Sequence, residues 1–189
     1  MTMRQVSPAL SPALSPALSP ALSLLLLALL ACVLTACSPK YNWREAHGEK
    51  IQFTVLLPAK PASFTRQIDL DGLPVSMTMT AAEIDGVTFA VGAAELADAA
   101  QTPKALEAMR TALLNNIGGT PTAATIPGKP AVDRSLDVVA AGVARGQPMR
   151  LMARLLARDK RIYQVLIVGP EKSIETEHAE TFFTSFAPS

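Results

Sequence analysis

The sequence predicts an α+β fold in which an antiparallel sheet of about seven strands is flanked by two helices. Three observations indicate this class. Short segments with apolar residues at alternate positions are separated by turn pairs such as Asp71-Gly72 and Asp85-Gly86, which are typical of antiparallel hairpins. Two longer segments carry apolar residues at helical spacing. The order is four strands, a helix, three strands and a helix, so we expect the helices to cover the sheet.

The first four strands are predicted from period-two alternation of apolar and polar side chains. They cover residues 51–57, 64–70, 75–81 and 87–91. Pro58 and Pro61 end the first strand, because proline cannot donate to a strand ladder. The third strand alternates most regularly and places Val75, Met77 and Met79 on one face, which predicts an antiparallel meander with one apolar face.

The middle helix is predicted to begin at Thr102-Pro103, where a hydroxyl can cap the helix and proline can occupy its first turn. Apolar residues at helical spacing follow: Leu106, Met109, Leu113 and Ile117. Gly118-Gly119 is expected to end the helix. Residues 120–132 contain three prolines and are predicted to form a loop.

The second half contains three predicted strands and the last helix. The strands cover residues 135–144, 149–157 and 161–168. Residues 161–168 are largely apolar on both faces, so this strand should be central in the sheet. The last helix is identified by an apolar stripe of Ala179, Phe182, Phe183 and Phe186.

The N-terminal region has the layout of a secretory signal peptide, with Arg4 ahead of an uninterrupted apolar run over residues 24–34. This run falls short of the ~20 residues that a membrane-spanning helix needs. Four copies of Ser-Pro-Ala-Leu occupy residues 7–22, and we interpret them as a tandem duplication in a tolerant segment. Residues 1–36 are therefore predicted to be removed.

The motif Leu34-Thr35-Ala36-Cys37 resembles the lipobox of bacterial lipoproteins. The resemblance implies attachment of a diacylglyceryl group to the Cys37 sulfur, cleavage between Ala36 and Cys37, and acylation of the new amino terminus. Fatty acyl chains at Cys37 would anchor the protein stably in a lipid bilayer. Because Ser38 is not aspartate, the outer membrane, on its periplasmic face, is favoured over the inner membrane. The alternative is an ordinary cleaved signal peptide with a chance cysteine.

The remainder of the chain is predicted to form a polar tether over residues 37–50 and a single domain over residues 51–187. Trp43 in the tether either lies at the lipid interface or closes one end of the sheet. Of the 17 basic side chains only Arg4 lies in residues 1–36, and none of the 16 acidic ones does. The body is therefore electrically neutral, which argues against nucleic acid as a partner.

The sequence offers little catalytic chemistry. It has two histidines, His47 and His178, and no Gly-x-Ser-x-Gly motif. Each histidine lies among glutamates, but a metal site needs three or four protein ligands, so solvated polar segments are favoured at both places. The paired aspartates of Asp69-x-Asp71-Gly72 are explained by a hairpin turn. We predict no catalytic residues, no metal and no cofactor.

One candidate binding site is a stripe of three arginines, Arg150, Arg154 and Arg158. They occupy even positions of a predicted strand whose odd positions are apolar, so we expect them on its outer face. Two interpretations stay open. The arginines pair with carboxylates such as Asp137 or Glu107, or they bind an acidic protein segment or an anionic polymer.

Several segments together resemble the PsbP-like α/β/α sandwich, which is known from a photosystem II extrinsic subunit and from bacterial periplasmic lipoproteins, including DcrB-like ones. The segments are FTVLLPAKP, GVTFAVGAAEL, RIYQVLIVGP, FFTSF and the middle helix ending in Gly-Gly. The YNWRE segment after Cys37 is similar to the start of a group of proteobacterial lipoproteins. The resemblance covers nearly all of residues 41–187 and implies a fold rather than a catalytic residue.

These observations predict a lipid-anchored protein that acts as a binding or envelope-assembly module without catalysis. Its expected partners are the bilayer, through acylated Cys37, and an envelope protein. The alternative is a small-molecule carrier or an enzyme that uses a pocket between the sheet and the helices.

Overall fold

The computed structural model describes residues 40–130, 132 and 134–189, and these residues belong to one compact unit, Lys40–Ser189. The strands are β1 (Arg44–His47), β2 (Phe53–Leu57), β3 (Ala62–Asp69), β4 (Pro74–Ile84), β5 (Val87–Glu95), β6 (Thr120–Pro121), β7 (Ser135–Ala144), β8 (Gln147–Arg158), β9 (Arg161–Pro170) and β10 (Ala187–Pro188). The helices are α2 (Thr102–Asn116), α3 (Thr176–Ser185) and the short 3₁₀ turns η1 (Ala99–Gln101) and η2 (Glu171–Ser173).

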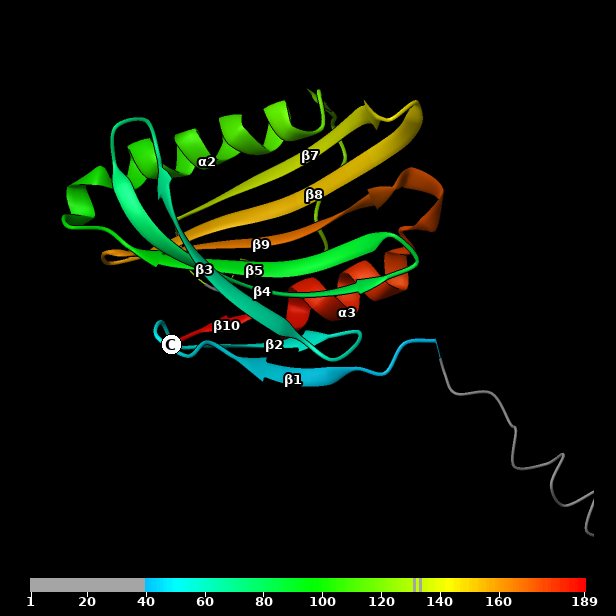
Figure 1. Ribbon diagram of the computed structural model, residues 1–189, viewed down its shortest axis with the longest axis horizontal. Helices are drawn as coiled ribbons and strands as arrows, with labels where there is room; N and C mark the ends of the chain where they lie inside the picture. The colour runs from blue at the N-terminus through cyan, green and yellow to red at the C-terminus, as the bar shows by residue number, and fades with distance from the viewer. Residues whose placement is uncertain (1–39, 131, 133) are drawn as a thin grey trace, which may run out of the picture. The chain divides into compact units, whose positions relative to one another are not determined.

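The main sheet has seven antiparallel strands in the order β3-β4-β5-β9-β8-β7-β6. Strand β9 stands in the middle, as its two apolar faces predict. The predicted α+β class, with a seven-stranded antiparallel sheet and two helices packed on it, is confirmed (Figure 1).

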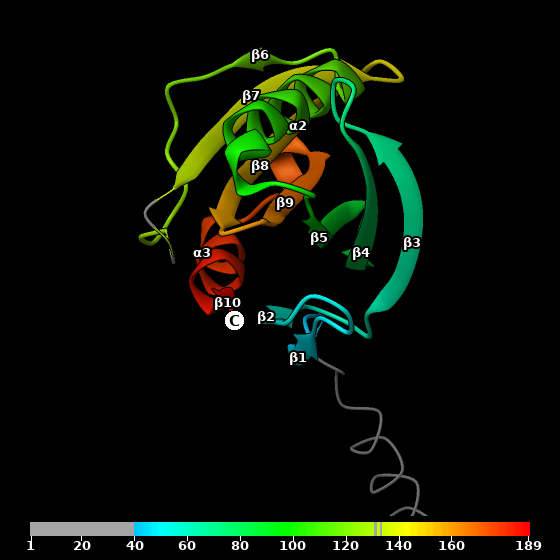
Figure 2. The same cartoon turned by 90° about the vertical axis from the view of Figure 1, so that its left-hand side faces the viewer.

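The main sheet has a separate core on each face. Helix α2 covers one face, where Met109 and Leu113 pack against β4, β8 and β9. Helix α3 and the smaller sheet cover the other, where Phe182 and Phe183 pack against β5, β8 and β9 (Figure 2). Because β5, β8 and β9 have apolar residues on both faces, these central strands are buried from both sides.

Strand β2 belongs to a second sheet of three strands, in the order β1-β2-β10. The expectation that residues 51–57 join the main sheet is therefore wrong. Phe53, Val55 and Leu57 are buried, and they contact α3 across the open face of the main sheet instead of extending that sheet. The seventh strand of the main sheet is the two-residue β6, in a segment that was expected to be a loop throughout.

The expected tether also differs from the structure. Residues Arg44–His47 form β1, which pairs antiparallel with β2 and buries Ala46. The folded unit therefore begins before residue 51. The reason is that β2 offers a free ladder edge, and pairing satisfies backbone groups on both strands.

Two-residue turns close three of the hairpins. Asp85 and Gly86 both have positive φ, of 50° and 75°, between the paired residues Ile84 and Val87. This is the conformation that joins strands without opposing their natural twist.

The start of α2 departs from the predicted cap. Thr102 lies inside the helix, and its hydroxyl donates back to the Ala99 carbonyl. Asp98 provides the cap one turn earlier, where its carboxylate accepts a 2.9 Å hydrogen bond from the Ala100 amide. The sequence did not predict the capping role of Asp98, because the 3₁₀ turn η1 precedes the expected helix start at Thr102-Pro103.

Candidate functional site

The predicted lipidation and cleavage residues, Ala36 and Cys37, lie outside the residues that the structure describes. Among the described residues, no helix combines the length and the apolar character required to span a bilayer.

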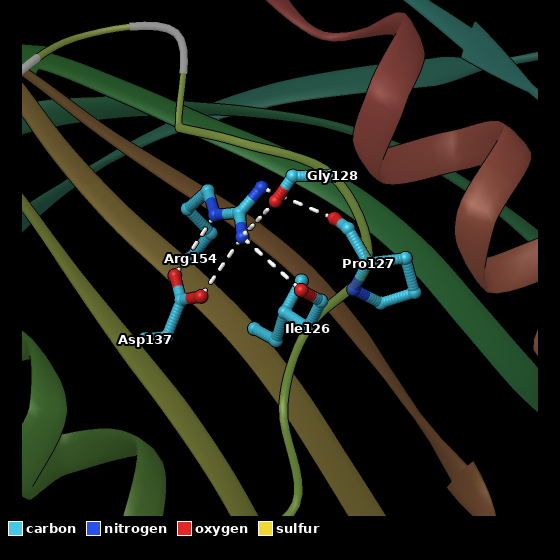
Figure 3. A network of polar contacts seen from close by, with 5 residues as sticks. All are labelled: Ile126, Pro127, Gly128, Asp137 and Arg154. Carbon is cyan, nitrogen blue, oxygen red and sulfur yellow. Dashed lines mark hydrogen bonds and ion pairs between the residues drawn. The ribbon is translucent and has the colours of Figure 1, made fainter.

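Arg154 of the predicted stripe is buried rather than exposed on an outer face. Its side chain donates two hydrogen bonds of 2.8 Å to the Asp137 carboxylate, through Nε and Nη2. It also donates to the backbone carbonyls of Ile126, Pro127 and Gly128, at 3.4, 3.3 and 3.0 Å (Figure 3). With 3% of its surface exposed, Arg154 holds residues 126–128 on β8. For Arg154, this agrees with the first of the two interpretations, in which the arginines pair with carboxylates such as Asp137.

The three arginines do not form one free surface. Arg150 lies 3.5 Å from the Glu171 carboxylate, and Arg158 donates a 3.1 Å hydrogen bond to the Pro188 carbonyl. Glu107, the other expected partner, pairs instead with Arg110 on its own helix. Each arginine thus meets a different element, so the binding stripe is not supported.

The two histidines lie on different elements, and each pairs with a glutamate of its own segment. His47 is 3.1 Å from Glu45 on the exposed strand β1, and His178 is 3.5 Å from Glu175 at the start of α3. In the part of the chain that the structure describes, no group of three or more His, Cys, Asp or Glu residues is placed to hold a metal ion.

The residues around Tyr41 form an aromatic clasp. The Tyr41 ring stacks on His178, with centroids 3.6 Å apart, and Trp43 stacks on Tyr41 at 5.9 Å. Trp43 also meets the edge of Phe89. It therefore lies half-buried on the body, as the interpretation that it closes one end of the sheet requires. Burial raises the pKa of Tyr41.

The feature best suited to binding is a groove between β3 and α2, with a volume of about 290 Å³. The main sheet curls at its β3 edge, so the β3–β4 hairpin rises beside α2 (Figure 2). Met109, Leu113 and Asn116 of α2 line one side, and Met77 and Met79 of β4 line the other. Sites for small molecules have this concave, mostly apolar character.

A glycine lies beneath the two methionines of β4 that line the groove. Gly92 of β5 lies opposite Met79 in the ladder. A Cβ atom at Gly92 would lie 2.6 Å from the Met79 sulfur and 3.1 Å from the Met77 sulfur. Both thioethers therefore fold over the bare backbone at position 92. Flexible methionine side chains can adapt to the shape of a ligand.

Gln164 puts a polar group into this apolar surface. It lies on the central strand β9, paired with Gly92 on one side and with Leu155 on the other. Its side chain lines the groove and makes no hydrogen bond to any residue that the structure describes. It is half-buried, so its amide is open to the groove.

The outer wall of the groove carries a cation. Phe64, Arg66 and Ile68 follow one another on the same face of β3 and line the groove. Phe64 is 47% exposed, and the Arg66 guanidinium lies 4.9 Å from the centre of its ring. Arg66 takes part in none of the ion pairs between described residues. Asp69, at the far end of the wall, accepts a 2.6 Å hydrogen bond from the Gly72 amide.

Sequence reasoning identified the parts of this groove without identifying the groove. Met77, Met79 and Met109 were each assigned to an apolar face, as they are in the structure. Gln164 was the available signal, because it interrupts an otherwise apolar central strand. Arg66 carried no signal, since arginine at an exposed strand position is ordinary.

No protein family, curated protein or solved structure was found to match this chain. The resemblance to PsbP-like and DcrB-like proteins therefore stays a prediction.

Proposed function

We propose that this protein is a lipoprotein of the outer membrane, on its periplasmic face, whose folded body is a non-catalytic binding module. The proposal for the anchor rests on the lipobox at Cys37. The proposal for the body rests on the groove between β3 and α2, which we take to be its binding site.

One observation carries the binding proposal. Gln164 is a hydrogen-bonding side chain in the middle of an apolar face, on the most central strand, and it is open to the groove. A polar group in such a place costs folding free energy unless water or a ligand satisfies it. A groove with adaptable thioether walls and a polar floor is suited to a small molecule with both apolar and polar parts.

Catalysis is less well supported. Acid–base or nucleophilic chemistry needs a reactive group within hydrogen-bond reach of its activating partner. Among the described residues that line the groove there is no histidine, serine or cysteine. Its titratable groups, Arg66 and Asp69, lie on the outer wall. Binding without turnover is the function that this arrangement fits.

The test uses the full-length protein in isolated membranes and a photoreactive octanol probe that carries a diazirine and an alkyne. We expect cross-linking that unlabelled octanol displaces, on peptides of β3, β4 or α2. Ala112→Trp should abolish it, because Ala112 is exposed on α2 and lines the groove. Glu180→Trp, on the exposed side of α3, is the matched control and should label normally. Labelling that Ala112→Trp leaves unchanged would reject the groove as the binding site.

A further inference from the structure

The groove carries different chemistry at its two ends. Arg66 stands on the edge strand β3, and Gln164 stands on β9, three strands further into the sheet. Neighbouring strands lie about 4.8 Å apart, so the two backbones are separated by ~14 Å in a flat sheet. The curl of the sheet at β3 shortens the span that a ligand has to bridge.

The surface between these ends is apolar. Met77 and Met79 lie between Arg66 and Gln164 on one side, and Met109 and Leu113 face them from α2. The groove volume of about 290 Å³ lies at the lower end of the range found for small-molecule sites, which suits a ligand of modest size. A linear chain of eight carbons with one polar head has that size.

The positive charge of Arg66, at the outer end of the groove, favours a ligand with a negatively charged head group. A guanidinium without a carboxylate partner binds a carboxylate through two parallel hydrogen bonds. Phe64 holds the Arg66 guanidinium against its ring at the entrance, which fixes the cation beside the apolar channel. The Asp69 carboxylate is the one nearby negative group that lines the groove, and the Gly72 amide engages it.

We propose that the groove binds a small linear amphiphile, with a carboxylate at Arg66, an apolar chain of about eight carbons over the methionines, and an uncharged hydrogen-bonding group at Gln164. This assignment rests on the binding function proposed above and adds the class of ligand. A second polar group is required because a plain alkyl tail would leave the Gln164 amide facing a hydrocarbon.

The experiment measures displacement of the photoreactive octanol probe from the full-length protein in isolated membranes. Three unlabelled competitors are compared: octanol, octanoate and 8-hydroxyoctanoate. Each competitor partitions into the bilayer to the same extent whichever variant is present. For each competitor we measure the concentration that displaces half of the probe. The ratio of these concentrations for two competitors is then compared between variants, and a change in the ratio reports on the groove alone.

Arg66→Gln should reduce the preference for octanoate over octanol by about fivefold, the upper end for a solvent-exposed ion pair. Arg44→Gln, which removes an exposed arginine from β1, should leave that preference unchanged. Gln164→Met should reduce the preference for 8-hydroxyoctanoate over octanoate by about fivefold, as expected for one neutral hydrogen bond. Thermal melting of each variant checks that the body stays folded.

The outcomes separate this assignment from the function on which it rests. If the probe labels the groove but either preference is the same in the variant as in the wild type, the ligand class is wrong and the binding function stands. If the probe does not label the groove of the wild type, both proposals fail.

Discussion

Arg154 and Asp137 face each other across the β7–β8 ladder and are joined by two parallel hydrogen bonds of 2.8 Å. The same guanidinium donates to three carbonyl groups of the 120–132 segment. One side chain therefore ties a segment with little regular structure to the main sheet.

Replacement of Arg154 should destabilise the protein strongly. Arg154→Gln leaves the Asp137 carboxylate without its cation and three carbonyls without a donor, so we expect a loss of about 3 kcal/mol. For a body of this size that corresponds to a fall in Tm of about 6–12 °C. Arg158→Gln is the control, because its exposed hydrogen bond to the Pro188 carbonyl should contribute less than ~1 kcal/mol. The stability of both variants is measured by thermal and by urea denaturation. If Arg154→Gln and Arg158→Gln destabilised the protein equally, the structural role of Arg154 would be contradicted.

Tyr163 should make the protein sensitive to alkali. Burial raises the pKa of Tyr163, and nearby Arg161 opposes this shift. Above about pH 10 the unfolded chain therefore loses the phenolic proton before the folded chain does, and the free energy of unfolding falls as the pH rises. Tyr163→Phe removes this contribution and gives up only a long, 3.4 Å hydrogen bond to the Gln52 carbonyl. Urea titrations between pH 8 and 11 should show that the free energy of unfolding declines less steeply with pH in Tyr163→Phe than in the wild type. If the two declines were parallel, the role assigned to Tyr163 would be refuted.

The aromatic clasp should control access to the N-terminal segment of the body. Tyr41→Ala removes the stack on His178 and the contact with Trp43. We expect this loss to lower the free energy of local opening of the segment by about 1.4 kcal/mol. Trypsin cleavage after Arg44 should then accelerate about tenfold. Asn42→Ala is the matched control, since only the Asn42 backbone amide bonds to the Pro58 carbonyl. Identical cleavage rates for the two variants would show that the clasp does not hold the segment.

Lipidation is tested in cells with a clickable fatty acid. Cys37→Ala should abolish labelling and leave a precursor that migrates more slowly, because the thiol is the acceptor for the diacylglyceryl group. Cys32→Ala removes a cysteine from within the apolar run and should retain full labelling. Labelling that survives Cys37→Ala would refute the lipoprotein assignment.

The secondary structure was predictable because alternation and turn chemistry are local. Residues 135–144 form a strand with the predicted bounds, and the Phe182–Phe183 stripe lies on α3 as expected. The central place of β9 also followed from its sequence, since both of its faces are apolar. The division into two sheets could not be predicted from the sequence, because β2 pairs with β10, which lies more than a hundred residues further along the chain.

The candidate site was less predictable than the fold. Arg154 and Arg158 occupy equivalent positions of one strand, yet only Arg154 is buried, because residues 126–128 of an aperiodic segment lie against it. The groove depends on the curl of the sheet at β3, and the packing of its methionines depends on the absence of a side chain at Gly92. Neither leaves a periodic signal in the sequence.

The pairing of β5 with β9 also bears on how the chain acquires its structure. Gly92 meets Gln164 in that ladder, with α2, β7 and β8 inserted between them along the chain. In a nascent chain that ends before β9, β5 and β8 each lack the strand that pairs with them, so their backbone groups on that edge are unpaired. Such long-range pairing slows folding. The central ladder can close only after β9, which ends at residue 170 of 189, is available. This delay would keep the chain unfolded during passage through a translocation channel, the route that the predicted signal peptide requires.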